Sequence, residues 1–192
     1  MRYSFNSVVR LMILPFGILV AGCSSVTTDQ PLPRMSGTFE QGLFEGVWMA
    51  NDQILMVQFS SDGIARVAGL EWKDDEFQLE RAELILSGGD DLKVASVRAQ
   101  EDGEWLDQYF FVQYEFTQQG DLVLRLPNVD FFDEAVSDGR LEGFVDRGEY
   151  GRDIRVGASP EVFLEFLKGQ DPSVIFGVGD PVVLKRVCGG DS

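Results

Sequence analysis

The chain has 192 residues, with 16 Lys and Arg against 32 Asp and Glu, two cysteines and no histidine. This length fits one globular domain plus a terminal segment, and a hydrophobic content of 44% is enough for a real core. The formal charge of −16 argues against nucleic-acid binding, because phosphate contacts need clustered Lys and Arg. The absence of histidine removes Ser-His and Cys-His nucleophiles and every zinc site with a His ligand.

The N-terminus has the pattern of an export signal. Arg2 and Arg10 precede or flank an apolar run over residues 11–22, which is too short to span a bilayer because a spanning helix needs about 20 residues. The run ends in Val20-Ala21-Gly22-Cys23, which resembles the lipobox of bacterial lipoprotein precursors. The resemblance implies a signal peptide over residues 1–22 and a thioether-linked diacylglycerol on Cys23.

The same resemblance implies a location for the protein. In Gram-negative members of that family, an Asp after the lipidated cysteine favours retention in the inner membrane, and here Ser24 follows Cys23. We therefore expect a protein that is lipid-anchored in the outer membrane, with its domain facing the periplasm. Residues 1–22 hold two arginines and no carboxylate, so their removal changes the formal charge from −16 to −18. Such a surface is repelled by anionic headgroups, and attachment would depend on the acyl chains.

Lipidation of Cys23 would leave Cys188 as the one unmodified cysteine and would exclude an intramolecular disulfide. Cys188 lies beyond the last apolar run, and we interpret it as a terminal thiol rather than a nucleophile. We expect residues 189–192 to form a tail.

Residues 24–41 are rich in Ser, Thr, Gln and Pro and show no periodicity, so together with Cys23 they are predicted to form a lipidated, flexible tether over 23–41. From residue 42 onward short β-like runs alternate with turn clusters, which predicts a single β-rich domain over 42–188. The predicted strands are Gly46–Ala50, Gln53–Ser60, Ile64–Trp72, Glu76–Leu86, Leu92–Gln100, Glu104–Phe116, Asp121–Leu126, Gly143–Asp146, Ile154–Gly157 and Val182–Val187.

One of these runs changes the phase of its alternation. In residues 76–86, Phe77 and Leu79 occupy one phase, whereas Ala82, Leu84 and Leu86 occupy the other. A slip of one residue would bring both sets to the same face, so the pattern predicts a β-bulge near Glu80-Arg81.

Two short helices are predicted within the strand pattern. The first begins with Asp130 as the expected N-cap and places Phe131, Phe132, Ala135 and Val136 on one face. The second begins at Ser159-Pro160, with Ser as N-cap and Pro in the first turn, and ends at Gly169. We expect this second helix to cover one open end of the strand assembly.

Short connections between successive strands indicate antiparallel neighbours. The predicted fold is therefore mainly β: an antiparallel up-and-down barrel, or a curved half-barrel, of 8–10 strands with two short helices. A closed barrel leaves no exposed strand edges, which favours it for so many strands. A two-sheet β-sandwich is the alternative.

The segment Gly46-Val47-Trp48 resembles the opening Gly-x-Trp of lipocalins, and Arg186 lies on the last predicted strand. The resemblance implies that Trp48 closes one end of the barrel and that Arg186 covers its ring by a cation–π contact. If the barrel holds a small apolar ligand, Phe59, Phe77, Phe110 and Tyr114 are expected to line the interior.

The sequence contains no recognisable catalytic, metal-binding or cofactor-binding motif. Its acidic residues cluster at turns, and none of these clusters has the spacing of a calcium loop. We therefore expect a non-enzymatic interaction or structural module of the cell envelope, held by acyl chains and bound to an envelope protein. The alternatives are a lipocalin-like binder of a small apolar ligand and a carboxylate-dependent cell-wall hydrolase. A hollow interior would favour the binder, and a packed interior with an exposed apolar patch would favour the module.

Overall fold

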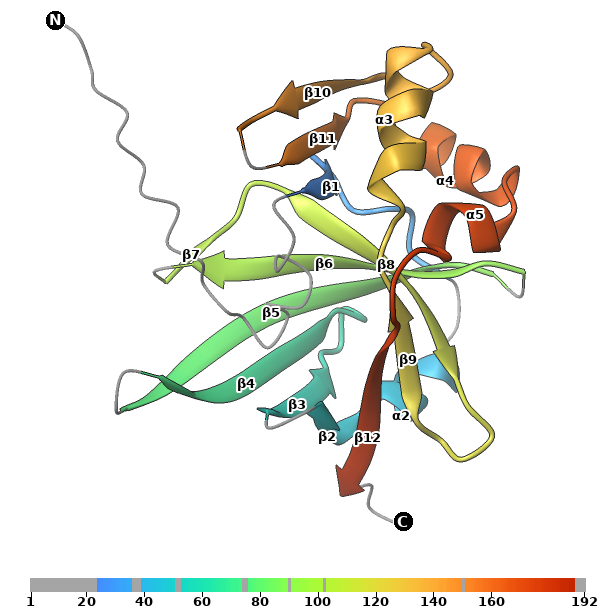
Figure 1. The fold of residues 1–192 in the computed structure, drawn as a ribbon. Coiled ribbons are helices and arrows are strands. Elements are labelled where there is room, and N and C mark those ends of the chain that lie inside the picture. Colours follow the sequence, from blue (N-terminus) through green and yellow to red (C-terminus); the bar gives the residue numbers. More distant parts are fainter. Residues whose placement is uncertain are drawn as a thin grey trace, which may run out of the picture.

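The structure is a computed structural model that describes residues 24–35, 39–50, 53–73, 76–89, 91–101, 103–149 and 151–188 (Figure 1). Eight antiparallel strands close into a barrel, because the last of them, β12, pairs with both β9 and the first strand, β2. The barrel strands are β2 (Gly46–Ala50), β3 (Gln53–Phe59), β4 (Ala65–Lys73), β5 (Glu76–Gly88), β6 (Lys93–Glu101), β8 (Tyr109–Phe116), β9 (Leu122–Arg125) and β12 (Val182–Cys188).

Each barrel strand pairs with the next barrel strand along the chain. This confirms the mainly β, up-and-down barrel and excludes the sandwich. The connections are tight turns, as between β8 and β9, where the Gly120 N–H donates to the Thr117 carbonyl oxygen at 3.0 Å. Gly120 has φ +85°, a conformation that favours glycine.

Burial alternates along the strands as a barrel requires. In β3, Leu55 and Val57 are buried inside the barrel, whereas Ile54 and Met56 are exposed on its outer face. The barrel core thus consists of one phase of each strand, and small residues such as Ala65, Ala82 and Ala95 alternate there with larger ones.

Strand β5 contains no bulge, so that prediction was wrong. Its pairing with β4 runs in constant register from Glu76 opposite Lys73 to Leu84 opposite Ala65. Phe77 and Leu79 point outward and are exposed, while Ala82 and Leu84 point into the barrel. The apolar residues of β5 change phase because they lie on the outer face in its first half and on the inner face in its second half, while the register stays constant.

Residues 24–35 are part of the fold, so the predicted tether was wrong for this stretch. Strand β1 (Ser25–Thr28) pairs in parallel with β11 (Arg152–Val156) and antiparallel with the beginning of β8. Val26 is only 2% exposed. These partners lie more than 80 residues further along the chain, so no local sequence pattern could predict β1.

The segment after β1 is fixed across the outer surface of β5 and β6. Leu32 is buried, its N–H donates to Ser96 Oγ at 3.0 Å, and its carbonyl oxygen accepts from Ser87 Oγ at 3.1 Å. Both serines are buried and both find partners there, which satisfies their polar groups without water.

A second layer covers the outer side of β6 and β8 (Figure 1). It contains β1, β10 (Gly143–Arg147), β11, α3 (Val129–Ser137), α4 (Pro160–Lys168) and α5 (Pro172–Phe176), while β7 (Glu104–Trp105) pairs with the end of β6. The centre of its core is Phe111 of β8, whose ring centroid lies 5.5, 5.1 and 6.1 Å from those of Phe132, Phe163 and Phe176.

The described chain has four helices where two were predicted. The additional helices are α2 (Phe39–Phe44) and α5, which begins with Asp171 as N-cap followed by Pro172. For α3 the N-cap is Asn128 rather than Asp130, because the Asn128 side chain accepts from the N–H groups of residues 130 and 131.

Helix α4 begins at Ser159-Pro160 and ends at Gly169, as predicted. It does not cover an end of the barrel, however, because Phe163 packs against Phe111 on the outer side of β8. It is α2 that contributes a side chain to the barrel core, because Phe44 at its end is buried there.

Candidate functional site

Trp48 and Arg186 are in contact with each other and with α2. The Arg186 guanidinium carbon lies 4.8 Å from the centroid of the Trp48 ring, and Trp48 is fully buried. The indole N–H donates to the Phe44 carbonyl oxygen at 2.7 Å, and Arg186 donates to the Leu43 carbonyl oxygen. These contacts join the last strand, the first barrel strand and α2.

Three of the four residues expected to line a ligand site lie in the barrel core. Phe59, Phe110 and Tyr114 pack there. The ring centroid of Phe44 lies 6.5 Å from that of Phe59, 4.9 Å from that of Tyr114 and 5.1 Å from that of Phe116. Phe77 does not line the interior, because it lies on the outer face of β5 and is 71% exposed. Aromatic rings thus occupy the end of the barrel next to α2.

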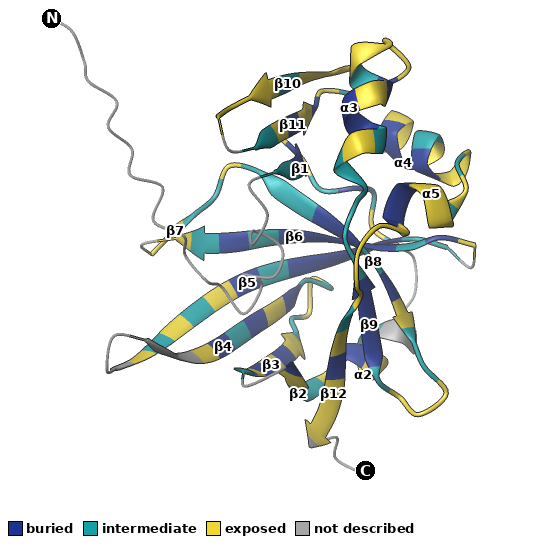
Figure 2. Cartoon of the chain, viewed as in Figure 1, coloured by how far each residue is buried: buried dark blue, intermediate teal, exposed yellow. Residues whose placement is uncertain are grey.

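The outer surface of β2 to β5 is unusually apolar, and we call it the apolar face. Its exposed members are Met49, Ile54, Met56, Leu70, Phe77 and Leu79. Strand register puts four of them in one row: Met49 lies opposite Ile54, Ile54 opposite Leu70, and Leu70 opposite Leu79. Figure 2 shows exposed and buried residues alternating along β4 and β5.

Basic side chains border the apolar face. Lys185 lies opposite Met49 at one end of the row, and Arg81 lies opposite Ala68 in the next row. Arg66 follows one row further, and all three side chains are exposed. Glu83 lies opposite Arg66, so Arg81 and Lys185 are the basic groups next to the apolar face that favour a partner surface with carboxylates.

A signal for the apolar face was present in the sequence. Ile54 and Met56 alternate with the core residues of β3, and Phe77 and Leu79 lie out of phase with the core residues of β5. The bulge was predicted because Phe77 and Leu79 were assigned to the core, whereas they lie on the outer surface.

A pocket of about 260 Å³ lies where β1, β8 and the connection from β9 to α3 meet, and Phe110 and Leu126 of its wall also pack against the barrel core. Its apolar wall consists of Val26, Phe110, Phe111, Leu126, Pro127, Val129 and Val178. Its polar residues are Ser24, Ser25, Asn128, Asp130 and Arg152. These residues come from distant parts of the chain, and no local sequence pattern could have identified them.

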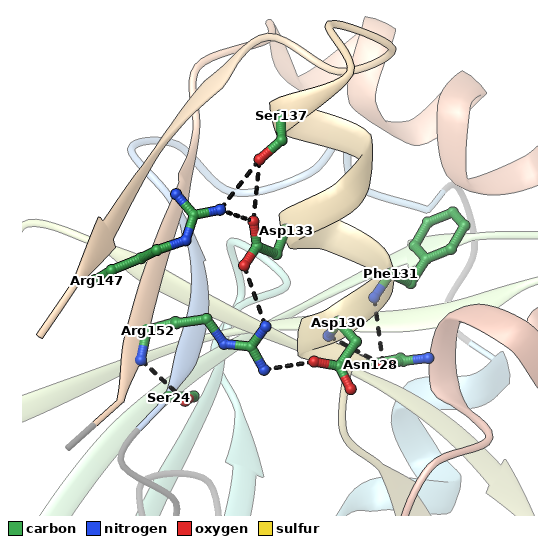
Figure 3. A network of polar contacts seen from close by, with 8 residues as sticks. All are labelled: Ser24, Asn128, Asp130, Phe131, Asp133, Ser137, Arg147 and Arg152. Carbon is green, nitrogen blue, oxygen red and sulfur yellow. Dashed lines mark hydrogen bonds and ion pairs between the residues drawn. The ribbon is translucent and has the colours of Figure 1, made fainter. Parts of the chain in front are cut away.

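A network of polar contacts adjoins the pocket (Figure 3). Arg152 donates to the carboxylates of Asp130 and Asp133, the latter at 3.1 Å, and its backbone N–H donates to Ser24 Oγ at 3.0 Å. Arg147 also donates to Asp133, as does the Ser137 hydroxyl at 3.1 Å. The network therefore joins α3 to both strands of the β10–β11 hairpin and to the residue that precedes β1.

Asp133 is the buried carboxylate of this network, with 7% exposure. Burial acts to raise its pKa, but the hydrogen bonds from Arg152 and Ser137 and the charges of Arg147 and Arg152 outweigh that effect and hold the pKa below its ordinary value. Asp133 is thus a structural anion and does not have the raised pKa of a general acid.

Candidate metal-binding groups and membrane-spanning helices are both absent from the described ranges. There, no group of three Cys, Asp or Glu side chains could hold a metal ion. In that same part of the chain, every helix is too short or too polar to cross a membrane. Cys23 and the predicted tail at 189–192 lie outside the described residues, and Cys188 ends β12 opposite Val47.

No protein-family model, curated protein or solved structure matches this chain significantly.

Proposed function

We propose that this protein is a lipid-anchored, non-enzymatic interaction module of the bacterial envelope. The anchor is Cys23 in the outer membrane, and the barrel faces the periplasm. The apolar face on β2 to β5 is the observation that carries the interaction role, because soluble monomers rarely leave a contiguous apolar surface of this kind uncovered. The opposite side of the barrel, at β6 and β8, is covered by the second layer of the same chain.

The partner we propose is an envelope protein with an apolar surface that is bordered by carboxylates. Exposed Leu70 lies within the row, and Arg81 and Lys185 border it. A second copy of this chain fits less well, since two strongly acidic molecules repel each other.

Crosslinking in intact cells, followed by mass spectrometry, tests this role. The wild type should yield a heterologous product, and Leu70→Asp should lose it while still folding, because Leu70 is half-exposed and its replacement leaves the barrel core intact. Val162→Asp is a matched control on the outer side of α4, where Val162 is 60% exposed, and should keep the product. Recovery of monomer alone from the wild type would contradict the proposal, and a homodimer would identify a second copy as the partner.

A binder of small apolar ligands is the second candidate, and the 260 Å³ pocket favours it. In this case the ligand site would lie between the barrel and its second layer rather than inside the barrel. Co-purification of a lipid with the wild-type monomer, without a crosslinked protein, would support the binder over the module.

A further inference from the structure

The described part of the chain begins with Ser24, directly after the proposed lipid attachment site. Ser24 Oγ accepts from the Arg152 N–H at 3.0 Å, and Ser25 Oγ donates to the Asp153 carboxylate at 2.8 Å. Both residues are therefore fixed to β11, and both line the pocket. Consecutive Cα atoms are about 3.8 Å apart, so a lipid attached to the residue before Ser24 can reach the pocket.

The polar groups at the pocket already have partners within the protein. Asn128 accepts from the N–H groups of residues 130 and 131 and donates to the Val174 carbonyl oxygen at 3.0 Å. Asp130 and Arg152 bind each other. A polar ligand would find few unpaired groups here, whereas a hydrocarbon chain needs none and would contact Val26, Phe110 and Val129.

The size of the pocket points in the same direction. Its volume of about 260 Å³ lies below the roughly 300–1,000 Å³ of sites for drug-sized ligands, so it suits a slim chain better than a ligand with several rings. Resting on the proposed lipid anchor, we infer that this pocket holds part of one acyl chain of the lipid on Cys23.

Photo-crosslinking with a fatty acid tests the inference on the full-length protein. Cells are grown with a palmitic acid analogue that carries a diazirine, irradiated, and the protein is purified and digested with trypsin. The peptide 126–140, cut after Arg125 and Arg140, contains the pocket residues Leu126 and Val129. We expect it to be joined through the acyl chain to the peptide that carries Cys23.

Two variants control the experiment. Val178 lies at the pocket on an exposed loop, so Val178→Trp should obstruct the pocket and reduce the crosslink at least several-fold without removing the label from Cys23. Val162→Trp places the same side chain at a similarly exposed position on α4 and should leave the crosslink unchanged.

The outcomes separate the inference from the anchor on which it rests. A labelled Cys23 without a crosslink to the pocket peptides would overturn the inference and leave the anchor standing. Pocket peptides joined to a lipid that is not attached to Cys23 would also overturn it, and would indicate a free lipid as the ligand. Absence of any label on Cys23 would overturn both.

Discussion

The contact between Trp48 and Arg186 joins the first and last strands of the barrel. Trp48 and Arg186 are 138 positions apart, yet the ring and the guanidinium are in contact at 4.8 Å. The sequence pointed to this pair through a resemblance, because a Trp near the start of the first strand and an Arg on the last strand become neighbours when a barrel closes. The hydrogen bond from Arg186 to the Leu43 carbonyl oxygen was not predictable, since α2 itself has no clear sequence signal.

Replacing Arg186 tests the energetic role of this contact. Arg186→Ala removes the cation–π contact and the hydrogen bond to the Leu43 carbonyl oxygen, so we expect the free energy of unfolding to fall by about 1–2 kcal/mol. Lys185→Ala, one residue away on the outer face, should change it by less than about 0.5 kcal/mol. Urea denaturation measures both, and equal losses would show that the contact with Trp48 contributes nothing.

At the scale of elements, strands with local turns and the capped helix α4 were predictable, because their signals lie within a few residues, whereas α5 was missed because it is only five residues long. Helix α4 has Ser159, Pro160 and Gly169 at the expected positions. Strand β1 was not predictable, since its stability comes from pairing with β11 and β8 rather than from its own sequence. Likewise, nothing local distinguishes Phe111, the centre of the second core, from the barrel residues that flank it.

The second core should depend strongly on Phe111. Phe111→Ala removes a buried ring that contacts Phe132, Phe163 and Phe176, and we expect a loss of about 3–5 kcal/mol in the free energy of unfolding. Phe144→Ala, at a position that is 66% exposed on β10, is the control and should cost far less. Similar losses in thermal or denaturant unfolding would contradict the assignment of Phe111 to a core.

The network around Asp133 predicts a dependence of stability on pH. Because its pKa is lower in the folded chain than the ordinary value of 3.8, Asp133 contributes stability that is complete above about pH 4 and is lost as the pH falls through the folded pKa. Asp133→Asn removes this contribution, so wild type and variant should differ most near pH 6 and converge toward pH 2. Asp138→Asn is the control, since Asp138 is exposed and lies 3.9 Å from Arg140. A difference from wild type that does not change with pH would contradict the role of the Asp133 charge.

At the scale of the molecule, the short connections were enough to predict an up-and-down barrel, because they leave successive strands little choice of neighbour. The position of the second layer was not predictable, since it depends on which outer surfaces the segments between β9 and β12 can reach. That layer covers β6 and β8 and leaves the apolar face of β2 to β5 exposed (Figure 2). The fixed position of Ser24 beside the pocket further means that an anchor on Cys23 would hold the domain close to the membrane surface.

The lipid on Cys23 is the central claim, because the location, the anchor and the occupant of the pocket all rest on it. Metabolic labelling of cells with a radioactive fatty acid tests it most directly, with wild type and Cys23→Ser compared after purification. We expect label on the wild type and none on the variant, whose larger, uncleaved form should also retain residues 1–22. An unlabelled wild type, or a Cys23→Ser protein that carries as much label as the wild type, would contradict the account.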